Sequence, residues 1–132
     1  MSGASSGRRT FPPANRLTRS AQFAVVRATG QRQGSPEFVV LACPNEVGYA
    51  RLGLAISVKA SGNAVARNRL KRICRESFRH HYDELSGWDV MIMARYGAGQ
   101  LARADLHRAL VRHWRRLASR AKVPVSTTPA RH

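Results

Sequence analysis

Two stretches of this chain carry apolar residues on one side of a helix and basic residues on the opposite side. The first runs from residue 64 to about residue 82, and its apolar side consists of Ala66, Leu70, Ile73, Cys74 and Ser77. The second runs from residue 101 to about residue 117, and its apolar side consists of Leu106, Ala109, Leu110, His113 and Leu117. Because such a helix must bury its apolar side against another layer, both stretches require a partner with a matching hydrophobic face.

Three segments with strand character can supply that layer: Phe38–Cys43, Arg51–Val58 and Trp88–Arg95. In the second segment the side chains alternate, and one face holds only Arg51, Gly53, Ala55 and Ser57. Small residues there let either a packed helix or a bound strand of nucleic acid come close. A short helix at about residues 20–30 precedes them, and residues 31–36 and 59–63 are expected to be loops. This order predicts an α/β (α+β) two-layer sandwich, a mixed sheet of about four strands packed with about three helices.

The net charge of +16 on 132 residues points to an acidic partner. Nucleic acid, an anionic membrane surface and an acidic protein are the candidates, in that order. Only three of the 23 basic residues are lysines, and arginine favours bidentate contacts with phosphate. The length suits a single domain at residues 16–118, between a flexible basic arm at 1–15 and a flexible tail at 119–132.

Residues suited to catalysis or metal binding are scarce. Seven acidic residues are spread along the chain, and the five histidines lack metal-ligand spacing. The two cysteines, Cys43 and Cys74, make no disulfide framework, and the apolar runs are too short to span a bilayer. We therefore predict no catalytic residue, no metal site and no cofactor bound by the chain itself. A reduced cytoplasmic protein that does not enter a membrane is the simplest interpretation.

The segment GNAVARNRLKRICR at residues 62–75 has the highest density of basic residues. A glycine-containing loop leads into a helix start, which offers free N–H groups and a positive dipole end. Two turns rich in guanidinium groups follow, and these bind phosphate oxygens in pairs. A solvated basic surface would show the same composition, so these features alone do not identify a partner.

The same segment closely resembles the signature of the protein subunit of bacterial ribonuclease P, an Arg-Asn-Arg helix entered through Gly-Asn-Ala. The resemblance extends to Asn15-Arg16-Leu17, to the strand at residues 51–59 and to residues 89–117. It implies a fold similar to a domain of a small-subunit ribosomal protein, with a left-handed βαβ crossover in place of the usual right-handed one. The implied function is removal of the 5′ leader from precursor tRNA, with the catalytic centre and its Mg²⁺ in the partner RNA. DNA is not an expected partner.

The resemblance also implies two sets of binding residues. Contact with the catalytic RNA falls to Asn63, Arg67, Asn68, Arg69, Lys71, Arg72 and Arg75. The single-stranded leader lies in a cleft between the sheet and the first helix, at Arg19, Phe23, Arg27, Gly53, Ala55, Ser57 and Lys59.

Two positions depart from the family pattern, because Arg27 and Leu41 stand where aromatic residues are common. Phe23 is an aromatic that could stack on a base or pack in the core. The alternative interpretation is that the chain is not part of an enzyme and is a ribosomal protein that binds rRNA.

Overall fold

A computed structural model describes residues 20–120, in which four strands form one mixed sheet of order β1-β2-β4-β3. The strands are β1 (Gln31–Gly34), β2 (Phe38–Pro44), β3 (Arg51–Leu54) and β4 (Trp88–Ala94). β2 pairs antiparallel with β1 and with β4, whereas β3 and β4 are parallel. The helices are α2 (Ser20–Thr29), α3 (Val58–Ser61), α4 (Ala64–His80) and α5 (Arg103–Ala118), with 3₁₀ turns η2 (Asp83–Leu85) and η3 (Ala98–Gln100).

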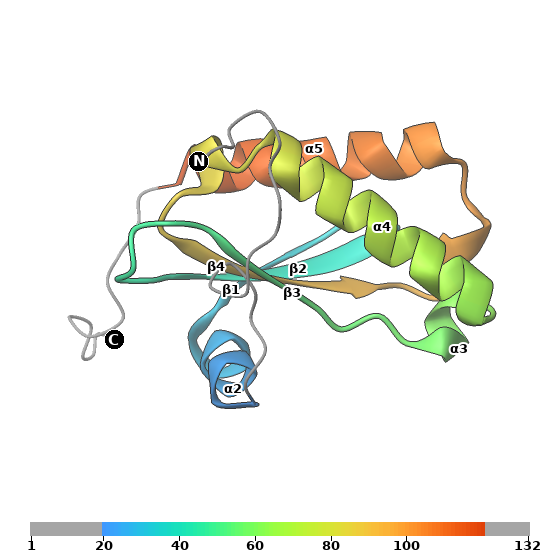
Figure 1. The fold of residues 1–132 in the computed structure, drawn as a ribbon, viewed down its shortest axis with the longest axis horizontal. Helices are drawn as coiled ribbons and strands as arrows, with labels where there is room; N and C mark the ends of the chain where they lie inside the picture. The colour runs from blue at the N-terminus through green and yellow to red at the C-terminus, as the bar shows by residue number, and fades with distance from the viewer. Residues whose placement is uncertain (1–19, 121–132) are drawn as a thin grey trace, which may run out of the picture.

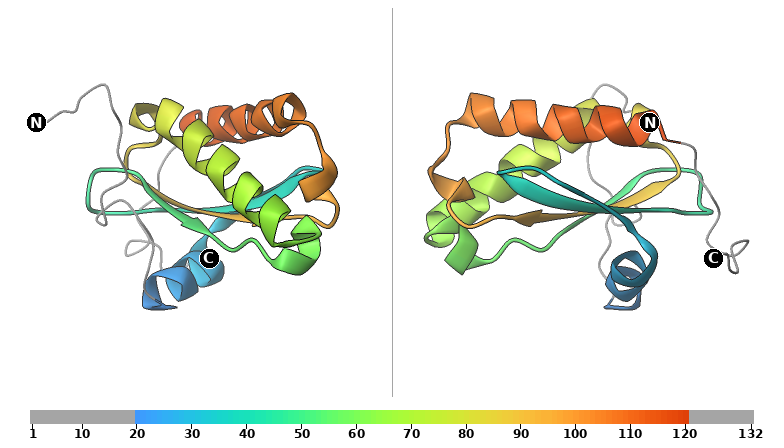
Figure 2. Two further views of the ribbon diagram at one scale, coloured as in Figure 1. Left: turned by 45° about the vertical axis from the view of Figure 1, so that its right-hand side comes forward. Right: turned by 180° about the vertical axis from the view of Figure 1, so that it is seen from behind.

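The helices are divided between the two faces of the sheet (Figure 1). α4 and α5 lie side by side on one face, while α2 lies on the other (Figure 2). The predicted mixed four-stranded sheet with packed helices is therefore confirmed. The predicted arm at residues 1–15 and most of the tail at 119–132 lie outside the described residues.

The main core fills the space between the sheet and the α4/α5 layer. Trp88, Trp114 and Phe78 are among its largest fully buried side chains, and Phe78 meets Trp114 edge to face with centroids 5.8 Å apart. The indole N–H of Trp114 donates to Ser77 Oγ over 2.7 Å, which joins α5 to α4 and satisfies both buried polar groups. Trp114, which the sequence pattern did not assign to the apolar side, is thus a central residue of this core.

The connection from β3 to β4 through α3 and α4 forms a βαβ unit. In Figure 1, β3 runs along the near edge of the sheet, α4 returns above the sheet, and β4 lies behind β3. When the sheet is viewed from the α4 side, with β3 and β4 both pointing up the page, β4 therefore lies to the left of β3. This arrangement is a left-handed crossover, contrary to the usual right-handed rule, as the family resemblance implies.

Two predicted boundaries are wrong. Residues 31–36 were expected to be a loop, but β1 forms there because Gln33 is buried and donates to His113 Nδ1 (2.9 Å) and to the His113 carbonyl (3.0 Å). The strand expected over Arg51–Val58 ends at Leu54, and Val58 begins α3 with 44% of its surface exposed. The predicted loop at 59–63 is therefore mostly the end of α3, followed by Gly62.

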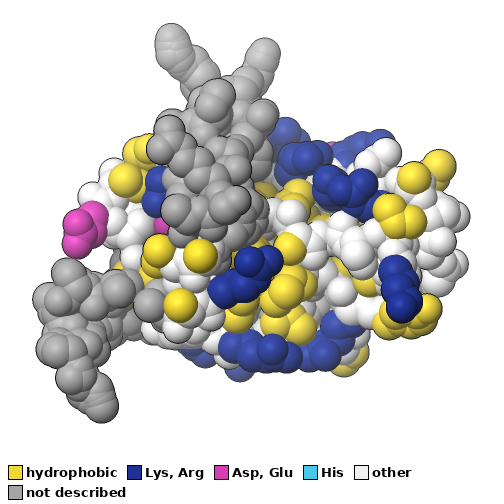
Figure 3. Space-filling view, turned by 90° about the horizontal axis from the view of Figure 1, so that it is seen from below, with side chains coloured by type: hydrophobic (Ala, Val, Ile, Leu, Met, Phe, Trp, Pro, Cys, Tyr) yellow, Lys and Arg dark blue, Asp and Glu magenta, His cyan; other side chains and the backbone are white. Residues whose placement is uncertain are grey.

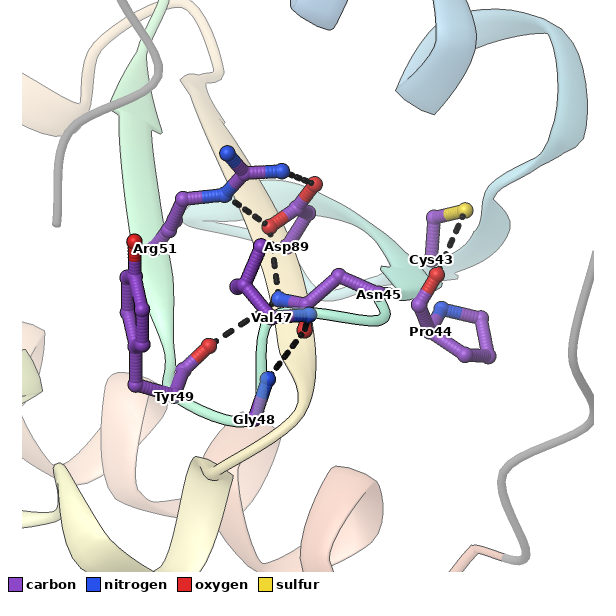
Figure 4. A network of polar contacts seen from close by, with 8 residues as sticks. All are labelled: Cys43, Pro44, Asn45, Val47, Gly48, Tyr49, Arg51 and Asp89. Carbon is purple, nitrogen blue, oxygen red and sulfur yellow. Dashed lines mark hydrogen bonds and ion pairs between the residues drawn. The ribbon is translucent and has the colours of Figure 1, made fainter. Parts of the chain in front are cut away.

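A polar network fastens the start of β3 to the start of β4 on the α2 face (Figure 4). Arg51 donates to both carboxylate oxygens of Asp89 over 2.8 Å, and this hydrogen bonding raises the pKa of Arg51. Asn45 Nδ2 donates to Asp89 Oδ1 (2.8 Å) and to the Tyr49 carbonyl (3.0 Å). The carboxylate of Asp89 is therefore matched by charged and neutral donors, which allows it to be buried in the sheet.

Candidate nucleic-acid interface

The start of α4 is defined by a glycine and an asparagine. Gly62 has a φ of 109°, a conformation that other residues rarely adopt. Asn63 caps α4, since its Oδ1 accepts a hydrogen bond from the Ala66 N–H over 2.8 Å. Because Asn63 is exposed, the N-terminal end of α4 lies at the surface.

Two arginines of the Arg-Asn-Arg segment are anchored to backbone carbonyls on either side of α4. Arg67 Nε donates to the Ile56 carbonyl over 2.9 Å, which ties α4 to the segment after β3. Arg69 donates to the carbonyls of Gly99 (3.3 Å) and Leu101 (2.9 Å), which ties α4 to the segment before α5. The sequence did not reveal these contacts, because their acceptors are backbone groups 11 to 32 residues away.

The same corner of the fold is tightly packed around Gly99. A Cβ atom at this position would lie 1.9 Å from the Ser61 carbonyl oxygen, so only glycine fits without movement. Two residues earlier, the Gly97 N–H donates to the Ala60 carbonyl over 3.1 Å. Together with Arg69, these contacts hold the beginning of α4 against the connection between β4 and α5.

The remaining polar side chains of the segment lie at the surface. Asn68, Arg72 and Arg75 are exposed and Lys71 is half-buried. Desolvation lowers the pKa of Lys71, and the charges of Arg67 and Arg75 lower it further. Arg67, Lys71 and Arg75 therefore form the row along one flank of α4 that the helical spacing predicts, and the row carries concentrated positive charge.

The one acidic residue of α4 lies on the opposite flank, toward α5. Glu76 Oε1 accepts a hydrogen bond from Arg103 over 2.6 Å and lies 3.7 Å from His107 Nε2. The hydrogen bond from Arg103 lowers the pKa of Glu76 despite partial burial. Glu76 thus serves the joint between the two helices and does not neutralise the basic row.

The second set of predicted residues is spread over the opposite side of the sheet. Gly53 pairs with Met91 in the sheet, and Ala55 packs with Met91, so both lie on the α2 face. Ser57 does not lie on a strand as expected. It caps α3, where its Oγ accepts from the Ala60 N–H over 3.0 Å, and Lys59 is exposed in that short helix.

On the first helix, Arg27 is exposed, Phe23 belongs to α2, and Arg19 lies outside the described residues. α2 itself packs on β2 and β4, where Val26 meets Leu41, Cys43 and Met91. Leu41, which replaces a common aromatic, is thus buried beneath α2. From the α2 side, Lys and Arg side chains surround an area of exposed hydrophobic atoms (Figure 3).

One exposed aromatic was not singled out in the sequence. Tyr96 lies two residues after the end of β4, next to Arg95, and 77% of its surface is exposed. It precedes Gly97, which bonds to α3, so the ring lies at the same end of the molecule as Lys59. A pattern of alternating strand residues gives no signal for such a side chain, since it lies beyond the strand.

The described part of the chain holds neither a reactive thiol at Cys74 nor a cluster of metal ligands. Burial raises the pKa of the Cys74 thiol to about 12, so Cys74 is a core residue without nucleophilic character. Within residues 20–120, no group of three His, Cys, Asp or Glu side chains could hold a metal ion. Over the same residues, no helix is long and apolar enough to cross a membrane.

Comparison with known proteins identifies the family. The family model for ribonuclease P matches residues 11–118. The chain belongs to the ribonuclease P protein family. The ribonuclease P protein component of a Marinomonas strain is 41% identical over 115 residues, which cover 86% of this chain and 87% of the relative. That of Pseudomonas aeruginosa is 42% identical over 111 residues, 83% of this chain and 82% of the relative.

Solved structures of ribonuclease P proteins share the fold. The protein from Staphylococcus aureus is 32% identical, with a TM-score of 0.72 over 80% of this chain and 95% of that one. The protein from Thermotoga maritima is 28% identical, with a TM-score of 0.69 over 76% and 96%. The chain is therefore a subunit of ribonuclease P, a tRNA-processing ribonucleoprotein, and these relatives favour this function over that of a ribosomal rRNA-binding protein.

Proposed function

We propose that this subunit binds the RNA component of ribonuclease P through α4 and holds the 5′ leader of precursor tRNA on the α2 face of the sheet. The RNA contacts are Asn63, Arg67, Asn68, Arg69, Lys71, Arg72 and Arg75. The leader contacts are Arg19, Phe23, Arg27, Gly53, Ala55, Ser57 and Lys59. Bond cleavage, with its Mg²⁺, takes place on the RNA, and the complex works in the cytoplasm.

The observation that carries this proposal is the basic row on the free flank of α4. Lys71 lies between Arg67 and Arg75, close enough for both charges to lower its pKa, and Glu76 points to the other flank. Such charge is costly unless an anion neutralises it. A row of guanidinium and ammonium groups beside an exposed helix N-terminus is well suited to the phosphates of folded RNA.

The anchoring of Arg67 and Arg69 supports a division of labour within the segment. A guanidinium that already donates to backbone carbonyls keeps fewer donors for phosphate, whereas Arg72 and Arg75 are exposed. Arg67 and Arg69 thus hold α4 in position and contribute their charge. Arg72, Arg75 and Lys71 supply most of the direct phosphate contacts.

For the leader, the support comes from the α2 face of β3. Gly53 is buried and Ala55 half-buried, and because their side chains are small or absent, we expect a strand of RNA to approach the sheet at Ala55. Arg27 on α2 and Lys59 on α3 are both exposed and provide phosphate contacts. Tyr96, exposed at the same end as Lys59, adds a ring on which a base can stack.

Reconstitution tests the proposed division between protein and RNA. Precursor tRNA is incubated with the purified chain alone, with the RNA component alone, and with both, over a series of Mg²⁺ concentrations. We expect no cleavage by the protein, and a lower Mg²⁺ requirement with both than with RNA alone, because the subunit neutralises phosphates. Cleavage by the RNA-free protein would contradict the proposal.

The leader contacts are tested separately with precursor tRNAs that differ only in leader length. Arg27→Gln and Lys59→Gln should weaken binding of a substrate with a long leader and leave that of a leaderless tRNA unchanged. Arg32→Gln, at an exposed position on the edge strand β1, removes the same charge and serves as the control. Equal losses for both substrates would show that these residues do not contact the leader.

A further inference from the structure

The outer surface of α5 carries a second concentration of positive charge, separate from the one on α4. The inner side of α5 is buried in the core through Leu106, Ala109, Leu110, His113, Trp114 and Leu117. The exposed arginines on its outer side are Arg108, Arg112, Arg115 and Arg116. We refer to these four residues as the α5 arginine surface.

Only part of this charge is neutralised within the described part of the chain. Arg108 pairs with Asp105, the one acidic residue of α5, and Arg112 lies 3.9 Å from Glu37 Oε1. Arg115 and Arg116 have no acidic partner in the described part of the chain. Arg108 and Arg112 remain 65% and 59% exposed in spite of their neighbours.

The buried histidine beneath this surface lies close enough to Arg112 and Arg116 for their charge to affect it. His113 is held by Gln33 and by Ser35, whose Oγ lies 3.0 Å from His113 Nε2. Desolvation lowers the pKa of His113 to about 4, with Arg116 and then Arg112 as further causes, while Glu37 opposes them. The field of the α5 arginine surface thus reaches into the core, and an external anion would relieve it.

The two basic surfaces face different directions. The row on α4 lies on the flank toward β3, because Arg67 donates to the Ile56 carbonyl. α5 lies beyond α4 on the same face of the sheet and packs over β2, with Gln33 of β1 bonded to His113 (Figures 1 and 2). The joint between the helices is closed by the Glu76–Arg103 ion pair, which separates the two surfaces.

We infer that the α5 arginine surface is a second docking site for RNA phosphates, so that the subunit contacts two separate segments of RNA in the ribonuclease P complex. This inference rests on the proposed RNA-binding function. It extends that function to the outer surface of α5, which the proposed contacts on α4 and on the α2 face do not include. Arginines at positions i, i+4 and i+8 of a helix are spaced by about 6 Å, so the row Arg108, Arg112 and Arg116 spans several phosphates of an RNA backbone.

The chemistry of the surface favours structured RNA over a single strand. Every large apolar residue of α5 except the half-buried Val111 faces the core, so the surface offers no aromatic ring on which a base could stack. Recognition without stacking or base-edge contacts depends on phosphate charge and not on sequence. Binding at this surface is therefore expected to be strongly dependent on salt and tolerant of base changes.

The double variant Arg115→Gln/Arg116→Gln tests the inference, since neither side chain has an acidic partner in the described residues whose loss would unfold the protein. Binding of the full chain to the RNA component is measured over a series of salt concentrations. The slope of log K against log[salt] should become shallower by up to about 2, because each phosphate that the variant no longer neutralises reduces it by about 0.9. Chemical footprinting of the RNA should show reduced protection in one segment.

Two further variants make the result decisive. Arg72→Gln/Arg75→Gln on α4 should remove protection from a different segment of RNA, and Arg32→Gln reports the effect of one charge elsewhere. An unchanged slope in the α5 variant, or reduced protection in the same segment as in the α4 variant, would overturn the inference. If the α4 variant alone binds RNA normally, the proposed α4 interface fails while the α5 site stands.

Discussion

Arg69 and Arg72 lie about one turn apart on α4, and substitution of each by alanine should separate the two tasks of the basic segment. Arg69 donates to the Gly99 and Leu101 carbonyls over 3.3 and 2.9 Å, whereas Arg72 is exposed on the outer side of the helix. Both substitutions remove one positive charge. They differ in whether the deleted side chain holds the fold together.

The magnitudes follow from these contacts. A hydrogen bond from a charged donor stabilises a fold by about 1.5–3 kcal/mol, but Arg69 is half-exposed and one of its bonds is long, which reduces the total to about 1–2 kcal/mol. For a domain of this size, this corresponds to a fall in Tm of roughly 4–10 °C. Arg72→Ala should change the free energy of unfolding by less than about 0.5 kcal/mol.

Thermal unfolding followed by circular dichroism measures the first effect, and RNA binding over a range of salt concentrations measures the second. Arg72→Ala should make the slope of log K against log[salt] shallower by about 1 at unchanged Tm. Arg69→Lys keeps the charge but loses the forked donor geometry, so it should lower the Tm and retain the slope.

The reasoning would be refuted by Arg69→Ala unfolding at the wild-type temperature. That result would mean that the carbonyl contacts add nothing to stability and that Arg69 acts only on RNA. A fall in Tm for Arg72→Ala as large as that for Arg69→Ala would equally remove the distinction between anchoring and exposed arginines.

Three further predictions concern the stability of the fold. Asp89→Ala leaves the largely buried Arg51 without a counter-ion and should cost about 2–4 kcal/mol in urea unfolding, whereas a cost below about 1 kcal/mol would show that the pair is dispensable. Because the folded state lowers the pKa of His113 to about 4, unfolding free energy should decrease by at most about 3 kcal/mol as the pH falls from 6.5 to 4, and a pH-independent value would contradict this. Gly99→Ala forces a Cβ against the Ser61 carbonyl and should lower the Tm, while Gly48→Ala, with no atom near its Cβ position, shows only the strain of its φ of +84°.

Several features could be predicted from the chain alone because they depend on local periodicity. The apolar side of α4 follows from residue spacing. The preferences of single residues indicate an unusual backbone angle at Gly62 and a cap at Ser61 or Asn63, of which Asn63 is the one observed. The family signature at residues 62–75 is likewise a property of the linear sequence. The charge distribution along the chain also places most of the basic residues on helices.

Other features depend on contacts between distant residues. β1 forms where the local sequence indicates a loop, because Gln33 finds His113 on α5, 80 residues away. Leu41 lies buried under α2 although its position in the alternating pattern is compatible with either face of the sheet.

The linear order of residues determined which segments of this protein are amphipathic, where α4 begins and which family the chain belongs to. What only the tertiary structure decided is how each arginine is used: Arg67 and Arg69 hold carbonyls of neighbouring segments, Arg51 is matched by Asp89, and Arg115 and Arg116 are left facing solvent. The physical reason is that a guanidinium group has the same charge and donors everywhere, so its role depends on which acceptors the fold brings within reach.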